Sequence, residues 1–389
     1  MTQTDENESM QAQTDNAAEA ILPQEEALPP VEDTASAAEA VQPVADTASA
    51  AEAAEPAEPV DVKLARKRFS RAWLGVGLMS IVTFLVVNIV AIPIYMLDIE
   101  QSLQTMILWF VQDGVLYLIG LPICLLLLRG FPSAKPKETM KLGFGKLIGI
   151  FCASIFVMLV GAFLSNYINN LLSGTFGTDV SSLLQDNILG MNKLTMIIML
   201  VVIAPVMEEF LFRKVMIDRM RQYGERIAVF ASGLMFGLVH GNLMQAFYAT
   251  FLGWVFGYVY LRTGRLRYTI LLHFLVNGLS TIQSLLLTSL DPDIMETMLS
   301  LQLSDTEALM SMISPAVIGI VLTTLLQYAL GFVGIVMFII YIRKVYFNKP
   351  PQPLPIGKRF TTVFVNVGML VFLFAVIGQF AVSFIVGSL

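Results

Sequence analysis

The sequence predicts an all-α protein, a polytopic bundle of eight or nine transmembrane helices that follows a disordered N-terminal tail. Of its 389 residues, 56% are hydrophobic and 14% are charged, whereas about a quarter of the residues in a soluble domain are charged. Nine apolar stretches have about the length that crosses a bilayer. Residues 1–62 contain 15 acidic residues and no Lys or Arg, which leaves the rest of the chain with a net charge of +9.

The segment 1–62 is rich in Ala, Glu and Pro and poor in large apolar side chains. It repeats the sequence Asp-Thr-Ala-Ser-Ala-Ala-Glu-Ala at 33–40 and 46–53. Such a composition buries too little apolar surface to offset the entropy lost on ordering. We therefore predict a disordered acidic tail, which is a candidate segment for binding other proteins.

The remainder of the chain supplies the spans of the predicted bundle. The fifth and sixth nearly meet at Gly241-Asn242, so they could form a tight hairpin or a re-entrant pair, and the count stays at eight or nine. The predicted spans are 72–97, 105–128, 147–170, 194–212, 228–243, 245–261, 268–290, 316–342 and 361–387.

The basic residues support this topology. Of the 24 Lys and Arg residues, 23 fall just before the first span or in alternate connections between spans, and the connections on the other side contain only Lys193. The positive-inside rule assigns the basic side, and with it the N-terminus, to the cytoplasm. Since topology explains the basic excess, we expect no nucleic-acid partner. The pattern suits an integral protein of a bacterial plasma membrane.

We divide the chain into the tail 1–62, N-terminal helices 63–193, a core 194–290 and a C-terminal part 291–389. Within the last part, residues 291–313 have amphipathic spacing and predict a helix on the membrane surface. The two cysteines, Cys124 and Cys152, both lie in apolar stretches, which excludes a disulfide framework.

Polar residues inside the spans are the candidates for function, because charged groups in hydrocarbon are costly and usually face partners or a cavity. The fourth span ends in Glu208-Glu209-Phe210-Leu211-Phe212-Arg213, the fifth contains Phe236 and His240, and the seventh contains His273 and Asn277. Asp113 in the second span fits none of these clusters, and we interpret it as a structural hydrogen-bonding group. These three clusters hold both histidines of the chain.

Helical spacing separates the two glutamates. Glu209 and Arg213 are four residues apart, so they can pair on one face, whereas Glu208 points about 100° away. We predict that Glu208 is a general base and that Glu209 with Arg213 supports it. His273 and Asn277 also share a face and could stabilise an oxyanion.

The motifs EExxxR, FxxxH and HxxxN, on successive helices, resemble those of the CAAX-protease and bacteriocin-processing family of intramembrane endopeptidases, which includes the prenyl-protein endoprotease. The resemblance covers about 194–290. It implies that Glu208 with His240 activates a water, that His273 with Asn277 stabilises the tetrahedral oxyanion, and that no cofactor takes part. It further implies a hydrophobic or lipid-modified peptide or protein as substrate, cleaved near the cytoplasmic face among membrane lipids.

Three alternatives remain open on sequence. Glu208, His240 and His273 could instead bind zinc in a metallopeptidase, although the compact HExxH element is absent. The same fold could serve as a non-catalytic membrane scaffold, chaperone or immunity factor. A proton-coupled transporter would depend on Asp113.

Overall fold

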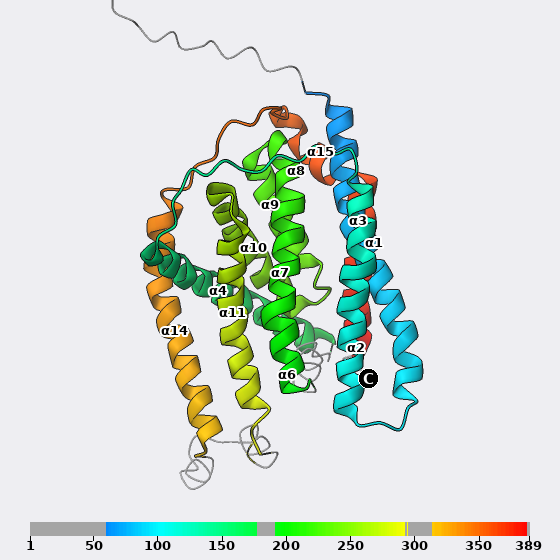
Figure 1. Ribbon diagram of the computed structural model, residues 1–389, viewed down its shortest axis with the longest axis vertical. Coiled ribbons are helices and arrows are strands. Elements are labelled where there is room, and N and C mark those ends of the chain that lie inside the picture. Colours follow the sequence, from blue (N-terminus) through cyan, green and yellow to red (C-terminus); the bar gives the residue numbers. More distant parts are fainter. Residues whose placement is uncertain (1–59, 177–190, 292–293, 295–312, 387–389) are drawn as a thin grey trace, which may run out of the picture. The chain divides into compact units, whose positions relative to one another are not determined.

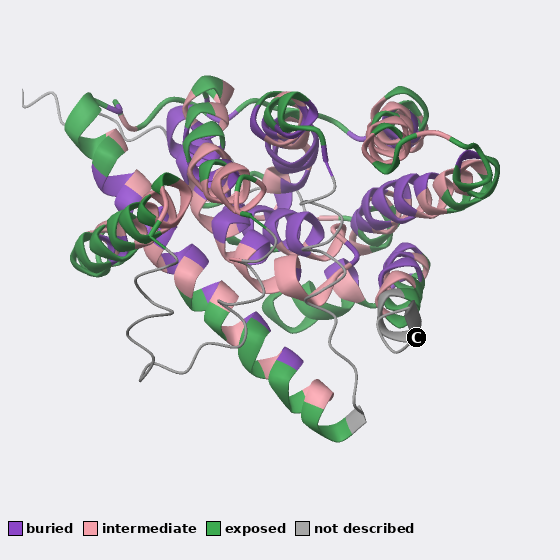
Figure 2. Cartoon of the chain, turned by 90° about the horizontal axis from the view of Figure 1, so that it is seen from below, coloured by how far each residue is buried: buried purple, intermediate pink, exposed green. Residues whose placement is uncertain are grey.

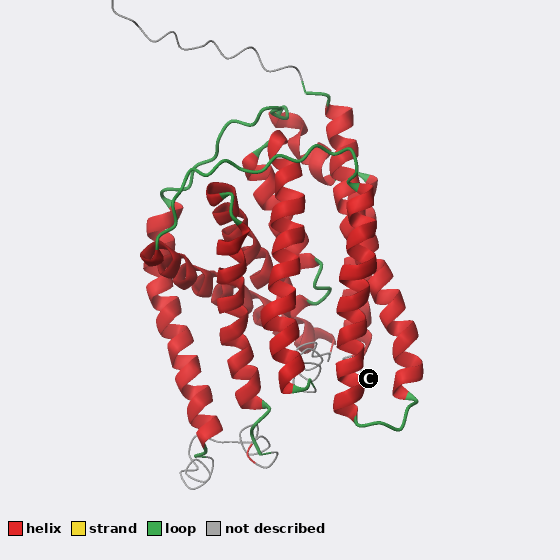
Figure 3. Ribbon diagram, viewed as in Figure 1, coloured by secondary structure: helices red, strands yellow, loops and turns green. Residues whose placement is uncertain are grey.

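The computed structural model describes residues 60–176, 191–291, 294 and 313–386, and over these residues it is helical and contains no strand (Figures 1 and 3). The predicted all-α fold class is confirmed. All described helices belong to one unit, Pro56–Leu389. The predicted tail lies outside the described residues except for its last three, and the predicted surface helix 291–313 lies outside them except near its ends.

Two of the predicted spans are interrupted by π-helical segments, labelled η1, η2 and η3, while η4 and η5 are 3-10 turns. The elements are α1 (Val62–Tyr95), α2 (Gln101–Gly114), η1 (Val115–Gly120), α3 (Leu121–Leu127), α4 (Phe144–Phe176), α6 (Lys193–Met196), η2 (Ile197–Ile203), α7 (Ala204–Glu209), η3 (Phe210–Ile217), α8 (Asp218–Met220), η4 (Arg221–Tyr223), α9 (Glu225–Leu238), α10 (Leu243–Thr263), α11 (Leu266–Leu287), α14 (Pro315–Ile342), η5 (Ile356–Lys358), α15 (Arg359–Phe364) and α16 (Val367–Val386).

The described helices include six that are long and apolar enough to cross a membrane, and the bent pair formed by η5–α15 and α16 makes a seventh if it is one span. The difference from the eight or nine expected lies in the fifth and sixth predicted spans. They correspond to α9, which has only 14 residues, and α10, which has 21. Because a span needs about 20 residues, α9 is too short to cross alone.

Helices α9 and α10 form a tight antiparallel hairpin, whose turn lies about halfway along the neighbouring helices (Figure 3). Gly237 permits the close approach, since a Cβ there would lie 1.9 Å from Thr250 Oγ1. Gly241 makes the turn with a φ of 66°, which favours glycine. This is the hairpin alternative left open by the sequence. A hairpin returns the chain to the side it came from, as two spans would, so the direction of every later helix is unchanged.

The five basic segments lie at one end of the helices, where α1 begins, α8 and α10 end, and the connection 343–355 passes (Figure 1). Lys193, at the start of α6, lies at the opposite end. The alternation deduced from the sequence therefore matches the arrangement of the helices.

Packing places α1 against α16, α4 against α14 and α10, and α9 against α10. Trp73 of α1 is fully buried, contacts Phe372 of α16 at 5.1 Å between ring centroids, and donates from Nε1 to the Val363 carbonyl. Figure 2 shows buried residues on the faces that helices turn toward one another and exposed ones on outward faces. On α14 the outward face is almost wholly apolar, as expected for a surface in contact with lipid.

Candidate active site

The two adjacent glutamates lie on α7, a six-residue α-helical segment between π-helical η2 and η3. In η2 the Ala204 N–H bonds to the Met199 carbonyl, five residues back. In that register the Leu200 carbonyl would pair with residue 205, which is a proline and has no N–H. The chain therefore presents a free carbonyl about two turns before the acidic pair, as π segments near functional sites often do.

Glu209 and Arg213 form a buried ion pair, and neither side chain is exposed. Arg213 Nη2 donates to Glu209 Oε1 at 3.0 Å, and Nε lies 2.9 Å from Oε2. The guanidinium also covers the ring of Phe236, with 4.7 Å between its central carbon and the ring centroid. The predicted pairing at a spacing of four residues is present.

His273 bridges the two glutamates. Its Nδ1 lies 3.1 Å from Glu209 Oε1, and its Nε2 lies 3.7 Å from Glu208 Oε2. Since Glu209 is an acceptor fixed by Arg213, we assign the proton of His273 to Nδ1. Glu209 therefore orients the imidazole so that Nε2 faces Glu208.

His240 is oriented in the same way by a different acceptor. Its Nδ1 lies 2.7 Å from the Phe236 carbonyl oxygen, which can only accept, so Nδ1 carries the proton and Nε2 keeps its lone pair. The Phe236 ring contacts both imidazoles edge to face, at 5.3 Å from His240 and 5.6 Å from His273. Both histidines thus have Nδ1 engaged and Nε2 available.

Asn277, one helical turn after His273 on α11, donates from Nδ2 to the Leu200 carbonyl at 2.8 Å. This is the carbonyl that Pro205 leaves unpaired. The bond fixes the amide and occupies one of its two N–H groups, and the second remains for another acceptor.

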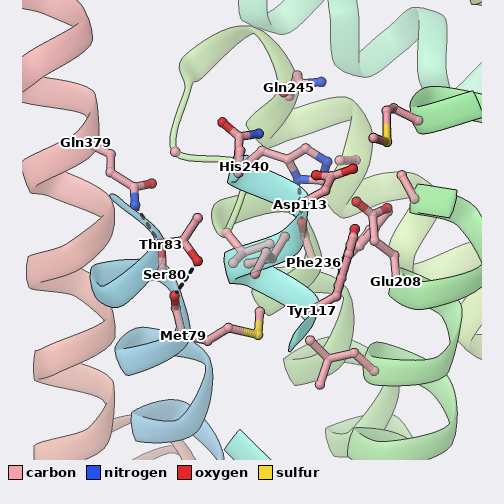
Figure 4. A pocket seen from close by; sticks show the side chains of 18 of the residues that line it. Met79, Ser80, Thr83, Asp113, Tyr117, Glu208, Phe236, His240, Gln245 and Gln379 are labelled. Atoms are coloured by element: carbon pink, nitrogen blue, oxygen red, sulfur yellow. Dashed lines mark hydrogen bonds between the residues drawn. The ribbon is translucent and has the colours of Figure 1, made fainter. Parts of the chain in front are cut away.

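Glu208, His240, His273 and Asn277 all line one cavity of about 410 Å³. Figure 4 shows Glu208 on one side of it and Ser80, Thr83 and Gln379 on the opposite side. Gln379 of α16 donates to Ser80 of α1 at 2.8 Å. The cavity therefore lies between the motif-bearing helices and the α1–α16 pair. The motif-bearing helices contribute the candidate catalytic groups, and the α1–α16 pair contributes polar, uncharged side chains.

Two further residues of this cavity, Asp113 and Tyr117, come from α2 and η1. Asp113 and Glu208 line this same cavity (Figure 4). Sequence reasoning noticed Asp113 as a charge within a span but gave it no place in the site, and it missed Tyr117. The spacing of four residues between them was the available signal.

The structure thus brings the four residues expected to be catalytic to one cavity, but the residue beside Glu208 differs from the one expected. His273, and not His240, is the imidazole beside Glu208; His240 forms its hydrogen bond with Phe236 and none with Glu208. The spacing rules placed each side chain on a face, but the rotation of three separate helices about their axes decides which imidazole is adjacent.

A zinc site would require three donors around one point. Among the residues described by the structure, no group of three or more His, Cys, Asp or Glu is arranged to hold a metal ion. Both cysteines are buried elsewhere. The described donors, as arranged here, do not fit a His₂Glu zinc site.

Comparisons with known proteins agree with the motifs. Residues 190–279 match the family model described as Type II CAAX prenyl endopeptidase Rce1-like. The chain is 29% identical over 196 residues, 48% of its length and 75% of the relative, to the Bacillus subtilis (strain 168) protein named "Putative membrane peptidase YdiL". No solved structure gave a match. The resemblance to the CAAX-protease family is confirmed.

Proposed function

We propose that the chain is an intramembrane endopeptidase that hydrolyses a peptide bond near the cytoplasmic membrane face, using a water activated by Glu208 and His240. The observation that carries this proposal is that helices α7 and α11 and the α9–α10 turn bring Glu208, both histidines and Asn277 to one cavity. The Glu208 carboxylate and the free Nε2 of His240 provide proton acceptors, and the Asn277 amide and a protonated His273 provide donors.

In the proposed reaction, a water bound between Glu208 and His240 donates one O–H to His240 Nε2 and passes its other proton to Glu208 as its oxygen attacks the substrate carbonyl carbon. The C=O electron pair moves to the carbonyl oxygen. The resulting oxyanion accepts from the second N–H of Asn277 and from His273 Nε2. Because Nδ1 of His273 already donates to Glu209, Nε2 can donate only in the imidazolium form, whose charge the two glutamates would balance. When the tetrahedral intermediate collapses, the C–N bond breaks and the proton passes to the leaving amine.

The substrate that fits this setting is a hydrophobic or lipid-modified peptide. The cavity lies among helices with apolar outward faces, and its lining contains four ionisable carboxylate and imidazole groups but no Lys or Arg. The family model is named for prenyl endopeptidases, which supports a lipid-attached substrate. The shared basic end of the helices supports a cytoplasmic N-terminus in a bacterial plasma membrane.

The test compares the peptides released from membrane proteins by wild type and by Glu208→Gln, each purified and reconstituted in vesicles. We expect Glu208→Gln and His240→Ala to slow cleavage at least about 100-fold while the protein stays folded. Glu138→Gln is a matched control, because Glu138 is a partly exposed glutamate that pairs with Arg265 outside the cavity. Full activity in Glu208→Gln would overturn the proposal.

Two additional arms separate the alternatives. A chelator should leave the rate unchanged, because the proposed mechanism uses no metal, and loss of activity restored by zinc would favour a metallopeptidase. Deletion of residues 1–62 should also leave cleavage unchanged. A scaffold or immunity protein would instead keep its effect in Glu208→Gln and lose it when a partner-binding tail is deleted.

A further inference from the structure

A second hollow, with a volume of about 510 Å³, lies at the basic end of the helices between α9, α10, α15 and the connection 343–355. It shares no residue with the catalytic cavity. We call it the aromatic groove and define it by its lining: Arg226, Ile227, Val229, Phe230, Trp254, Phe347, Arg359, Phe360, Val363 and Phe364.

The apolar part of the aromatic groove is built from packed rings. Phe230 stacks on Trp254, with 5.2 Å between ring centroids and 17° between planes, and meets Phe364 edge to face at 6.0 Å. Trp254 Nε1 donates to the Phe230 carbonyl at 3.2 Å, which links the indole of α10 to the backbone of α9. Phe230 is 46% exposed and Phe360 is 67% exposed. This leaves a preformed apolar surface open to its surroundings.

The two charged residues of the lining are both arginines. Arg226 lies over the Phe347 ring, at 5.3 Å, and Arg359 donates from Nε to the Leu354 carbonyl. Neither arginine forms an ion pair with a carboxylate among the described residues. The nearest acid in sequence, Glu225, pairs with Arg262 and accepts from Asn348.

The arginines and the aromatic rings of the groove follow one another in the same order as the charged headgroup and the acyl chains of a phospholipid. Arg226 is in the first turn of α9, at the basic end, and Phe230 follows four residues later, about 6 Å further along the helix. A phosphate between the two arginines would therefore have the rings on its inner side. Arginines at the membrane surface attract anionic headgroups by about 1 kcal/mol each.

We propose that the aromatic groove is a binding site for an anionic phospholipid, with the headgroup phosphate held by Arg226 and Arg359 and an acyl chain lying on Phe230, Trp254 and Phe364. The site is independent of the proposed peptidase chemistry, because no residue of it reaches the catalytic cavity. Since His240 lies in the turn that directly follows α9, bound lipid would stabilise the hairpin on which the catalytic cavity depends.

The fluorescence of Trp254 can report lipid binding in the aromatic groove. Trp254 is one of three tryptophans, and Trp73 is fully buried while Trp109 lines the catalytic cavity. Full-length protein in detergent micelles is titrated with phosphatidylglycerol or phosphatidylcholine carrying brominated acyl chains, and quenching of tryptophan fluorescence is followed. We expect phosphatidylglycerol to bind about 25-fold more tightly, which corresponds to about five-fold for each arginine.

Matched variants make the result specific. Arg226→Ala/Arg359→Ala should remove the preference, Arg226→Lys/Arg359→Lys should keep most of it, and Arg343→Ala/Lys344→Ala, at the same end but outside the groove, should keep it in full. Trp254→Phe should remove the quenching itself. Equal quenching by both lipids in wild type, or a preference that persists in the double alanine variant, would overturn the proposal. Displacement of phosphatidylglycerol by millimolar inorganic phosphate would also overturn it, because the site would then bind phosphate without a lipid chain.

Discussion

The buried pair of Glu209 and Arg213 gives the sharpest prediction about stability. Both side chains are completely buried, and the pair is joined by two contacts of 2.9 and 3.0 Å. Glu209→Gln keeps the shape and one acceptor but leaves the guanidinium charge without its partner. Breaking a buried pair in this way costs about 3–5 kcal/mol. Glu208, by contrast, is 19% exposed and has only a 3.7 Å contact with His273, so Glu208→Gln should cost less than about 1 kcal/mol.

The assay is unfolding by sodium dodecyl sulfate in mixed micelles, followed by tryptophan fluorescence. Glu209→Gln should unfold at a clearly lower detergent fraction than wild type, whereas Glu208→Gln and the control Glu138→Gln should unfold close to it. Glu209→Gln/Arg213→Met, which removes both charges, should recover part of the loss. If the two single glutamine variants were equally stable, the division of roles between the adjacent glutamates would be wrong.

Two further predictions concern the groups that hold the site together. Gly237→Ala should destabilise the protein by about 1–3 kcal/mol, because the added Cβ would lie 1.9 Å from Thr250 Oγ1, and it should impair cleavage; Gly357→Ala, with nothing within 4 Å, is the control. Equal unfolding curves for these two variants would contradict the close approach of α9 and α10. Asn277→Ala should lower kcat by about 100-fold with little change in KM if its amide stabilises the oxyanion. Unchanged kcat with a modest loss of stability would mean that Asn277 only satisfies the Leu200 carbonyl.

Much of the arrangement could be predicted from the sequence because membrane helices obey strong rules. Backbone groups in hydrocarbon must bond within the helix, so apolar stretches predict the helices and basic residues predict their direction. The spacing of Glu209 and Arg213 predicted their pairing for the same reason, since residues four apart in a helix are neighbours. The sequence left open whether α9 and α10 form two spans or one hairpin. Their two stretches are as apolar as true spans, and hydropathy does not indicate how deep into the membrane a helix reaches.

The neighbours within the cavity could not be predicted, because they depend on how separate helices are rotated and on local departures from α-helical register. His273 lies beside Glu208 only because α11 and α7 meet at that rotation. A π-helical turn shifts every later side chain of its segment by a fraction of a turn. No residue pattern in the sequence predicted these π-helical turns. The aromatic groove likewise depends on the connection 343–355 returning over α9 and α10, which no local pattern specifies.

The π segment before α7 also connects the stability of the fold to the proposed chemistry. Pro205 removes the donor that the Leu200 carbonyl would use in that register, and Asn277 supplies a replacement from α11. That single bond joins the helix carrying Glu208 to the helix carrying His273, and the contact between His273 and Glu209 joins them again one turn away. Two cross-helix bonds of this kind fix both the depth and the rotation of one helix relative to the other. A hydrolase that must hold a base and an oxyanion donor at a set separation needs such a constraint, whereas a scaffold needs only that the helices pack.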